Sequence, residues 1–272
     1  MLKRALLRRA EGPHGAYHVD SRIAEPVSVE DFGLQWREFD PYPELQALSH
    51  SHLFGRFLLP QGYFRDQVVV DLGCGNGRLG QFVIPEARAY IGVELSDAIT
   101  AFEVPAEYAG KVELVRASIE DVPLHDQTAD VVICWGALHH VADFRAGLAE
   151  IRRIVKPGGS LLIYVYPDVF AERENLNRLL KHVSAAQFRD FCGWFLDKVH
   201  LWATTDETLA TEVCRAMCTS RKPHAAWELI QMFDGLGPEH HHLLQRTIPA
   251  EFQPPWQVMA THAGCFVIEA PG

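Results

Sequence analysis

A glycine-rich segment, DLGCGNGRLG at residues 71–80, constrains the fold of this 272-residue chain more than any other feature. It follows Val68, Val69 and Val70, an apolar β-branched run that is typical of a buried strand, and it leads into a helical segment. Glycines at such a turn let a ligand approach the backbone, because a Cβ would block it. The segment therefore predicts a strand, a ligand-binding turn and a helix; the alternative is a glycine-rich turn that binds nothing.

Four further apolar runs of strand length follow this segment, at residues 90–95, 112–116, 131–135 and 160–166. The last two runs are separated by residues 144–155, whose apolar side chains recur at helical spacing. We expect Pro157 to end this helix and Gly158 and Gly159 to form the turn into the next strand. Strands that alternate with helices predict right-handed βαβ units, and therefore a parallel sheet with helices on both faces.

Two acidic residues lie at the ends of strands, where such a sheet binds its ligand. Asp71 ends the first strand, and Glu94 ends the second, roughly 20 residues later. An acid at the second position can accept hydrogen bonds from both hydroxyls of a ribose, in NAD or in an adenosyl ligand. The turn itself permits both interpretations. Residues 75–80 form the dinucleotide fingerprint Gly-x-Gly-x-x-Gly, whereas residues 71–77 form Asp-x-Gly-x-Gly-x-Gly.

Composition narrows the class of partner. Hydrophobic residues make up 48% of the chain and charged residues 22%, as in ordinary globular proteins. Asp and Glu (35) outnumber Lys and Arg (25), and the resulting net charge of −10 disfavours a nucleic-acid partner. No apolar run approaches the ~18 residues of a membrane span, and the 6 cysteines include no Cys-x-x-Cys pair. We therefore expect a cytoplasmic protein with free thiols and no membrane partner.

The middle of the chain carries five ordered motifs, which read VVVDLGCGNGRLG, YIGVELS, ASIEDVPL, ADVVICWGALHHV and EIRRIVKPGGSLLIYVY. These motifs resemble those of class I S-adenosylmethionine-dependent methyltransferases, and most closely the group with a His-His pair after the fourth strand. The likeness covers residues 66–166, and it specifies the fold and the cofactor better than the substrate.

The resemblance implies a Rossmann-like, doubly wound α/β fold with a mostly parallel seven-stranded sheet, closed by one antiparallel strand. We divide the chain into four parts on this basis. Residues 1–65 are expected to form an N-terminal lid or a loosely packed lead-in, and residues 66–167 the cofactor-binding core. Residues 168–245 are expected to form a helical cap over the substrate, and residues 246–272 the closing strands of the sheet.

The resemblance further implies S-adenosylmethionine as the cofactor and S-adenosylhomocysteine as the product. Asp71 would face the amino group of the cofactor, Glu94 would hold its ribose hydroxyls, and Leu95 would pack on its adenine. Three glycines would line the methionine portion: Gly73, Gly75 and Gly77.

At two further positions the sequence leaves more than one role open. The family often has a carboxylate near position 118 that binds the adenine amino group, but this chain has Ser118. Ser118, the backbone of Ile119 or Glu120 would then replace that contact. Trp135, at the end of the fourth strand, would lie beside the methionine portion or serve as a core aromatic residue.

The expected chemistry is direct displacement at a methyl group, with most of the rate coming from alignment of the reactants. A base is needed only where the acceptor must lose a proton. His139 and His140 lie at the mouth of the fourth strand, and either could be that base, or one could cap the next helix or pack under the sheet rim. Tyr166 would face the pocket or the rim. Asp143 is expected to be the N-cap of the following helix.

We expect a methyltransferase that acts on oxygen, carbon or nitrogen of a small apolar or aromatic metabolite. The sequence allows a homodimer. The chain lacks the Asn/Asp-Pro-Pro-Tyr/Phe motif of enzymes that methylate base or protein amines. An NAD-dependent oxidoreductase and a catalytically silent methyltransferase-like partner subunit are the alternatives. No metal site is expected, because the consecutive histidines at residues 240–242 do not converge easily on one ion.

Overall fold

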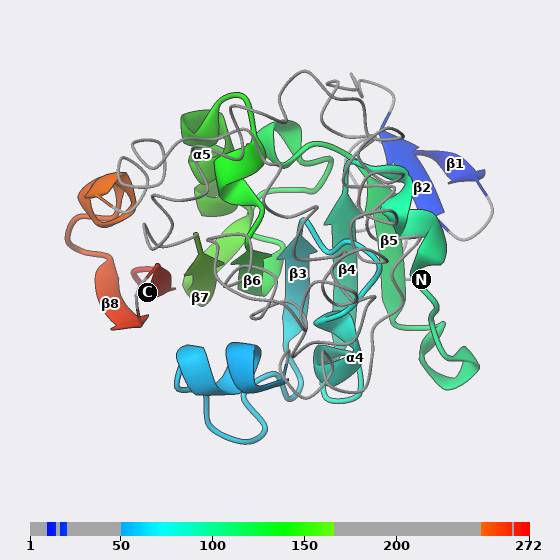
Figure 1. Cartoon of the computed structure of the whole chain (residues 1–272), viewed down its shortest axis with the longest axis horizontal. Helices are drawn as coiled ribbons and strands as arrows, with labels where there is room; N and C mark the ends of the chain where they lie inside the picture. The colour runs from blue at the N-terminus through cyan, green and yellow to red at the C-terminus, as the bar shows by residue number, and fades with distance from the viewer. Residues whose placement is uncertain (1–9, 15–16, 21–49, 166–245, 263) are drawn as a thin grey trace, which may run out of the picture.

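The computed structural model describes residues 10–14, 17–20, 50–165, 246–262 and 264–272 (Figure 1). The helical cap predicted over residues 168–245, Tyr166 and most of the N-terminal segment lie outside the described residues. Of residues 1–65, the structure describes two short strands and the stretch from residue 50 onward.

The described residues form a nine-stranded sheet in the order β1-β2-β5-β4-β3-β6-β7-β9-β8 (Figure 1). The seven strands from β5 to β8 in this order are those of the predicted doubly wound fold. Among them β9 alone runs in the direction opposite to the other six, as expected for one antiparallel strand. The strands are β1 Ala10–His14, β2 Tyr17–Asp20, β3 Val68–Leu72, β4 Ala89–Glu94, β5 Val112–Arg116, β6 Ala129–Trp135, β7 Val155–Tyr164, β8 Gln257–His262 and β9 Cys265–Glu269.

The chain reverses its direction of winding between β3 and β6. From β3 it proceeds through β4 to β5 on one side, and from β6 to β7 on the other. In open α/β sheets, ligands bind beyond the carboxyl ends of the strands at such a switch point. The residues that follow β3, β4, β6 and β7 are therefore the candidates for a ligand-binding site.

Two N-terminal strands extend the sheet beyond the predicted seven. β1 and β2 pair antiparallel, and β2 runs parallel to β5, with His18 opposite Val115 and Val19 opposite Arg116. Part of the segment predicted as a lid thus covers the β5 edge of the sheet, where backbone groups would otherwise lack partners.

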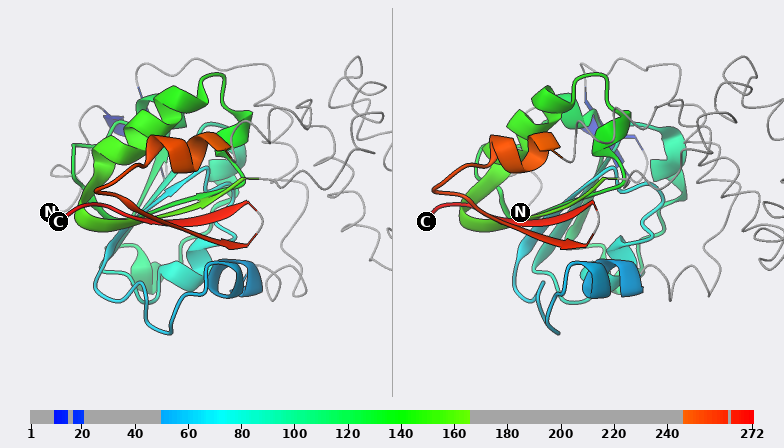
Figure 2. Two further views of the ribbon diagram at one scale, coloured as in Figure 1. Left: turned by 90° about the vertical axis from the view of Figure 1, so that its left-hand side faces the viewer. Right: turned by 60° about the vertical axis from the view of Figure 1, so that its left-hand side comes forward.

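Helices cover both faces of the sheet (Figure 2). One face carries α5 (Phe144–Ile154) and the helical residues 246–251, and the opposite face carries α4 (Gly80–Val83) and the π-helix η1 (Ser51–Arg56). Because both faces are covered, β3 is buried along its whole length. Among the described residues, none of the helices is long and apolar enough to cross a membrane.

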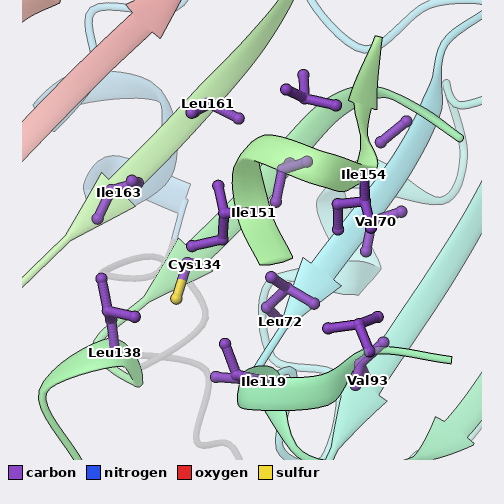
Figure 3. Packing of buried hydrophobic residues seen from close by; sticks show 14 of the residues in the cluster. Val70, Leu72, Val93, Ile119, Cys134, Leu138, Ile151, Ile154, Leu161 and Ile163 are labelled. Carbon is purple, nitrogen blue, oxygen red and sulfur yellow. The ribbon is translucent and has the colours of Figure 1, made fainter. Parts of the chain in front are cut away.

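The alternation of side chains along β3 separates two apolar cores. Val70 and Leu72 point toward α5, where they pack with Ile151 and Ile154 (Figure 3). Val69 belongs to the core on the other face. Asp71 alternates with Leu72, so its carboxylate also lies on the face of α4 and η1.

The start of α5 agrees with the sequence and its end does not. The Asp143 carboxylate accepts hydrogen bonds from the backbone N–H groups of Arg145 (2.9 Å) and Ala146 (3.2 Å), which confirms it as the N-cap. The helix ends at Ile154 rather than near Pro157, because β7 already begins at Val155.

Strand β7 begins early because its first residues pair with β6. Val155 lies opposite Ala129, and an irregularity in the register then brings Ser160 opposite Val131. The Lys156 ammonium group binds the Asp130 carboxylate at 2.6 Å and fixes this irregular stretch to β6. Residues 157–159, predicted as a stop and a turn, thus lie within an irregular part of the strand.

We predict that Asp143→Ala lowers the free energy of unfolding by about 1 kcal/mol, because it leaves two N–H groups of the first turn of α5 without their acceptor. Asp143→Asn retains an acceptor oxygen and should keep most of that stability. Urea denaturation of the three proteins measures the difference. Equal destabilisation by both substitutions would contradict a capping role.

Candidate functional site

The glycine turn begins where β3 ends, and its backbone is held against β4. The N–H groups of Gly73 and Cys74 both donate to the carbonyl of Val93, at 2.8 and 3.1 Å. Gly73, Gly75 and Gly77 have φ angles of +76°, +55° and +87°. Residues with a Cβ rarely adopt such angles, so the conformation of the turn favours glycine at these positions.

Two of these glycines also make room for the protein itself. A Cβ on Gly73 would overlap the Cβ of Ala137, in the loop after β6. A Cβ on Gly77 would lie 2.5 Å from the ring of Phe102, which follows the short helix η2 (Asp97–Ala101). The sequence argument assigned this space to a ligand, but at positions 73 and 77 the chain's own side chains approach the backbone.

Glu94 links the glycine turn to the end of β4. One carboxylate oxygen accepts from the N–H of Gly75 at 3.0 Å, and the other accepts from the N–H of Ser96 at 2.8 Å. The side chain is half-buried at the carboxyl end of the strand. A carboxylate can accept about four hydrogen bonds, so these two leave capacity for hydroxyl groups of a ligand.

Asp71 is buried on the neighbouring strand, with 1% of its surface exposed. The Tyr90 hydroxyl donates to its carboxylate at 2.7 Å. Burial raises the pKa of Asp71 to about 7, and the nearby Glu94 carboxylate adds to this rise, whereas the Tyr90 hydrogen bond and the Arg78 guanidinium act in the opposite direction. A cationic group placed at this carboxylate would favour its ionised form.

Leu95 and Ile119 follow adjacent strands at the same edge of the sheet. Leu95 is half-buried directly after β4, and its carbonyl accepts from the Arg116 side chain at 3.0 Å. Ile119 is buried after β5, and its side chain lies 3.7 Å from the position of a Cβ on Gly73. The contacts of Leu95 and Ile119 with a cofactor stay predictions.

Ser118 is engaged in capping the short helix η4 (Ile119–Asp121). Its hydroxyl accepts from the N–H of Glu120 and donates to the Glu120 carboxylate, both at 3.1 Å. The other Glu120 oxygen accepts from the N–H of Asp143 at 2.6 Å. Both side chains that the sequence offered for an adenine contact therefore hold η4 and the start of α5 in place.

Three predicted residues lie at the end of β6 and in the short helix that follows it. Trp135, the last residue of β6, stacks on Tyr164 with ring centroids 4.3 Å apart. His139 and His140 lie in the short helix η5 (Leu138–His140), with ring centroids 4.1 Å apart. His139 is completely buried, whereas His140 is partly exposed. The loop after β6 packs against the glycine turn, since a Cβ on Gly73 would overlap the Cβ of Ala137.

Two residues of this site were not singled out from the sequence. Tyr90 binds Asp71, and Phe102 fills the space beside Gly77 and contacts Tyr90 edge-on at 5.9 Å between centroids. The one signal for Tyr90 was a hydroxyl within an otherwise apolar strand. Phe102 gave no signal, because its contact depends on how the chain turns after β4.

Within the described part of the chain, no three His, Cys, Asp or Glu side chains are grouped so that they could hold a metal ion. The three consecutive histidines at residues 240–242 lie outside it, as does Tyr166. The described cysteines, Cys74, Cys134 and Cys265, are buried and free.

Several known proteins are similar to this chain. The family model described as "Methyltransferase domain" matches residues 70–163. A provisionally named methyltransferase of Encephalitozoon cuniculi is 30% identical over 139 residues, which are 50% of this chain and 62% of that protein. The ubiquinone biosynthesis O-methyltransferase of Vibrio atlanticus is 28% identical over 143 residues, 50% of this chain and 59% of that enzyme. The chain thus spans about six-tenths of the length of these relatives.

Solved structures with a similar arrangement are more distant. A provisionally named S-adenosylmethionine-dependent methyltransferase of Methanococcus maripaludis aligns with 90% of this chain and 89% of its own, at 14% identity and a TM-score of 0.46. The Haemonchus contortus phosphoethanolamine N-methyltransferase 1, in complex with phosphoethanolamine and S-adenosylhomocysteine, aligns with 52% of this chain and 33% of its own, at 16% identity and a TM-score of 0.41. The strand order of the chain itself carries the assignment of the fold.

The raised pKa of Asp71 predicts a pH-dependent stability. An ordinary carboxyl group of an unfolded chain ionises near pH 4, so between about pH 4 and 7 the folded protein binds more protons than the unfolded one. As the pH rises across this range, the free energy of unfolding should therefore fall, by up to about 1.4 kcal/mol per pH unit from this group. Asp71→Asn cannot titrate and should gain stability relative to the wild type as the pH rises.

Urea denaturation of both proteins from pH 5 to 8 measures this difference. Glu103→Gln, at an exposed carboxyl group, is the matched control and should show a constant difference from the wild type. A pH-independent difference between Asp71→Asn and the wild type would contradict the raised pKa.

Proposed function

We propose that this chain transfers a methyl group from S-adenosylmethionine to oxygen, carbon or nitrogen of a small molecule, because residues 70–163 match the methyltransferase domain family. The observation that carries the proposal is the Glu94 carboxylate, held by the N–H groups of Gly75 and Ser96 at the switch point of the sheet. The buried Asp71 lies on the next strand of the same edge.

The residues at this edge fit such a cofactor. Two carboxylates suit a ligand that carries an ammonium group, a sulfonium group and a ribose, since charged acceptors bind cations and paired hydroxyls. Asp71 would hold the amino group, Glu94 the ribose hydroxyls and Leu95 the adenine. The remaining proposed contacts come from the glycine turn and the neighbouring strands: Gly73, Gly75, Gly77, Ser118, Ile119 and Trp135.

When bound, S-adenosylmethionine supplies a methyl group activated by its sulfonium sulfur. The chain would contribute alignment of the acceptor, exclusion of water and, for a hydroxyl or carbon acceptor, removal of a proton. His140 is better placed than His139 to accept this proton, because His140 is partly exposed and His139 is buried. A role for Tyr166 stays a prediction.

A small-molecule acceptor is supported by the net charge of −10 and by the names of relatives, which are ubiquinone biosynthesis O-methyltransferases. The match to the methyltransferase family argues against the alternative of an NAD-dependent oxidoreductase. A silent partner subunit is distinguished by a turnover assay. The homodimer and the cytoplasmic location stay predictions from the sequence.

We predict that Glu94→Ala weakens the binding of S-adenosylhomocysteine by about 1–3 kcal/mol, because it removes a charged acceptor from two hydroxyls. Isothermal titration calorimetry on the folded variant measures this loss. Glu107→Ala, at an exposed carboxylate after β4, is the matched control and should bind as the wild type does. Unchanged affinity in folded Glu94→Ala would remove the ribose assignment, and binding of NAD in place of S-adenosylhomocysteine would overturn the proposal.

The cofactor affinity should also depend on pH. A cationic amino group at Asp71 favours the ionised carboxylate, so binding releases the proton that Asp71 holds below its pKa of about 7. The affinity for S-adenosylhomocysteine should therefore rise from pH 6 to 8 in the wild type and stay nearly constant in Asp71→Asn. Titrations across this range check it, and a rise of equal size in both proteins would place the titrating group elsewhere.

A further inference from the structure

A buried hydrogen bond joins Tyr90 of β4 to Asp71 of β3, on the face of the sheet that carries α4 and η1. The Tyr90 hydroxyl donates to the Asp71 carboxylate at 2.7 Å, and neither residue is more than 1% exposed. In the register of the two strands Asp71 lies opposite Gly92, so Tyr90 is its diagonal neighbour on the same face. The cofactor contacts proposed above give this tyrosine no role.

Two glycines leave the space that the Tyr90 side chain occupies. A Cβ on Gly92 would lie 3.3 Å from Cε1 of the ring, and a Cβ on Gly80 would lie 2.9 Å from the hydroxyl oxygen. Gly80 belongs to the helix α4, and a helix by itself favours alanine over glycine. Gly80 is also the last glycine of the Gly-x-Gly-x-x-Gly pattern at residues 75–80. The close approach of the tyrosine therefore gives this part of the pattern a structural reason.

The Tyr90 hydroxyl is a permanent hydrogen-bond donor. Phe102 contacts its ring edge-on, with centroids 5.9 Å apart, and helps to enclose it. Burial raises the pKa of Tyr90 well above its ordinary value, and the nearby Asp71 carboxylate adds to this rise. The hydroxyl thus keeps its proton at every physiological pH and can always donate to Asp71.

Tyr90 is also the group that most favours the ionised form of Asp71. Burial raises the pKa of this carboxyl group and Glu94 adds to the rise, whereas the Tyr90 hydrogen bond opposes it more strongly than the Arg78 guanidinium does. Within the described part of the chain, the titratable and charged groups that act on Asp71 or on which it acts come from β4, the glycine turn and β6: Tyr90, Glu94, Cys74, Arg78 and Cys134. Burial raises the pKa of both thiols, so they stay neutral near pH 7.

We propose that Tyr90 is a positioning residue of the cofactor site, whose hydroxyl fixes the Asp71 carboxylate and favours the charged form that a cationic cofactor requires. Tyr90 is completely buried and acts through Asp71, because a hydrogen bond donated to a carboxylate stabilises its charged form. This inference rests on the proposed methyltransferase function and adds a residue to the same site.

The test measures the affinity of the full chain for S-adenosylhomocysteine between pH 6 and 8.5 by calorimetric titration. Tyr90→Phe keeps the ring and removes the hydroxyl, so the pKa of Asp71 should rise by about one unit. The affinity of Tyr90→Phe should therefore be about tenfold below that of the wild type at pH 6 and nearly equal to it at pH 8.5. A merely structural role for the hydroxyl predicts the same loss at every pH, and that result would overturn the inference.

Two further proteins show whether Tyr90 acts through Asp71. Asp71→Asn cannot titrate, so adding Tyr90→Phe to it should leave the pH profile of the affinity unchanged. A pH-dependent effect of Tyr90→Phe in this background would contradict the proposal. Tyr108→Phe is the matched control, because it removes a hydroxyl from a half-buried tyrosine of η3 (Ala106–Tyr108), and it should follow the wild type.

Gly80→Ala disturbs the same hydrogen bond with the hydroxyl retained. The added methyl group crowds the Tyr90 hydroxyl, so the profile should shift in the same direction as in Tyr90→Phe, by a smaller amount. This variant also provides the test if Tyr90→Phe does not fold. A profile that stays where it is in every folded variant of the two overturns the inference.

The wild-type protein keeps the two proposals apart. If it binds S-adenosylhomocysteine at pH 8.5 and the variants do not shift the profile, the role of Tyr90 is wrong and the proposed function stands. If the wild type does not bind S-adenosylhomocysteine at any pH, the proposed function itself is overturned.

Discussion

The Glu94 carboxylate, with its two hydrogen bonds to Gly75 and Ser96, is the interaction on which the site depends. It fixes the end of β4 to the turn that follows β3, and the Val93 carbonyl reinforces this link by accepting two N–H groups of the same turn. The turn thus has its conformation before a ligand arrives. A site that is preorganised in this way does not have to order its backbone on binding, which is a major cost of association.

The glycines of the turn serve packing as well as conformation. Gly73 admits Ala137 and Gly77 admits Phe102, so the turn is enclosed by the loop after β6 on one side and by the segment after β4 on the other. Larger side chains at these positions would separate the two halves of the sheet edge. The close contact at Gly73 holds the loop after β6 against the turn that follows β3.

The sequence predicted those parts of the structure that depend on local pattern. Apolar runs predicted the strands from β3 to β7, and the position of Asp143 before an amphipathic segment predicted the start of α5. Strand β1 contains a glycine and a proline and has no alternating pattern, so nothing in its sequence indicated a strand. The hydrogen bond between Tyr90 and Asp71 joins residues on two different strands, so it could not be predicted from local spacing.

The charge of Asp71 depends on the ligand that lies beside it. Burial disfavours the ionised form and raises the pKa of this carboxyl group to about 7, so the group is only partly ionised near neutral pH. A cationic group of a ligand at this carboxylate stabilises the ionised form and lowers the pKa. Binding of such a cation and loss of the Asp71 proton are therefore coupled, and each favours the other.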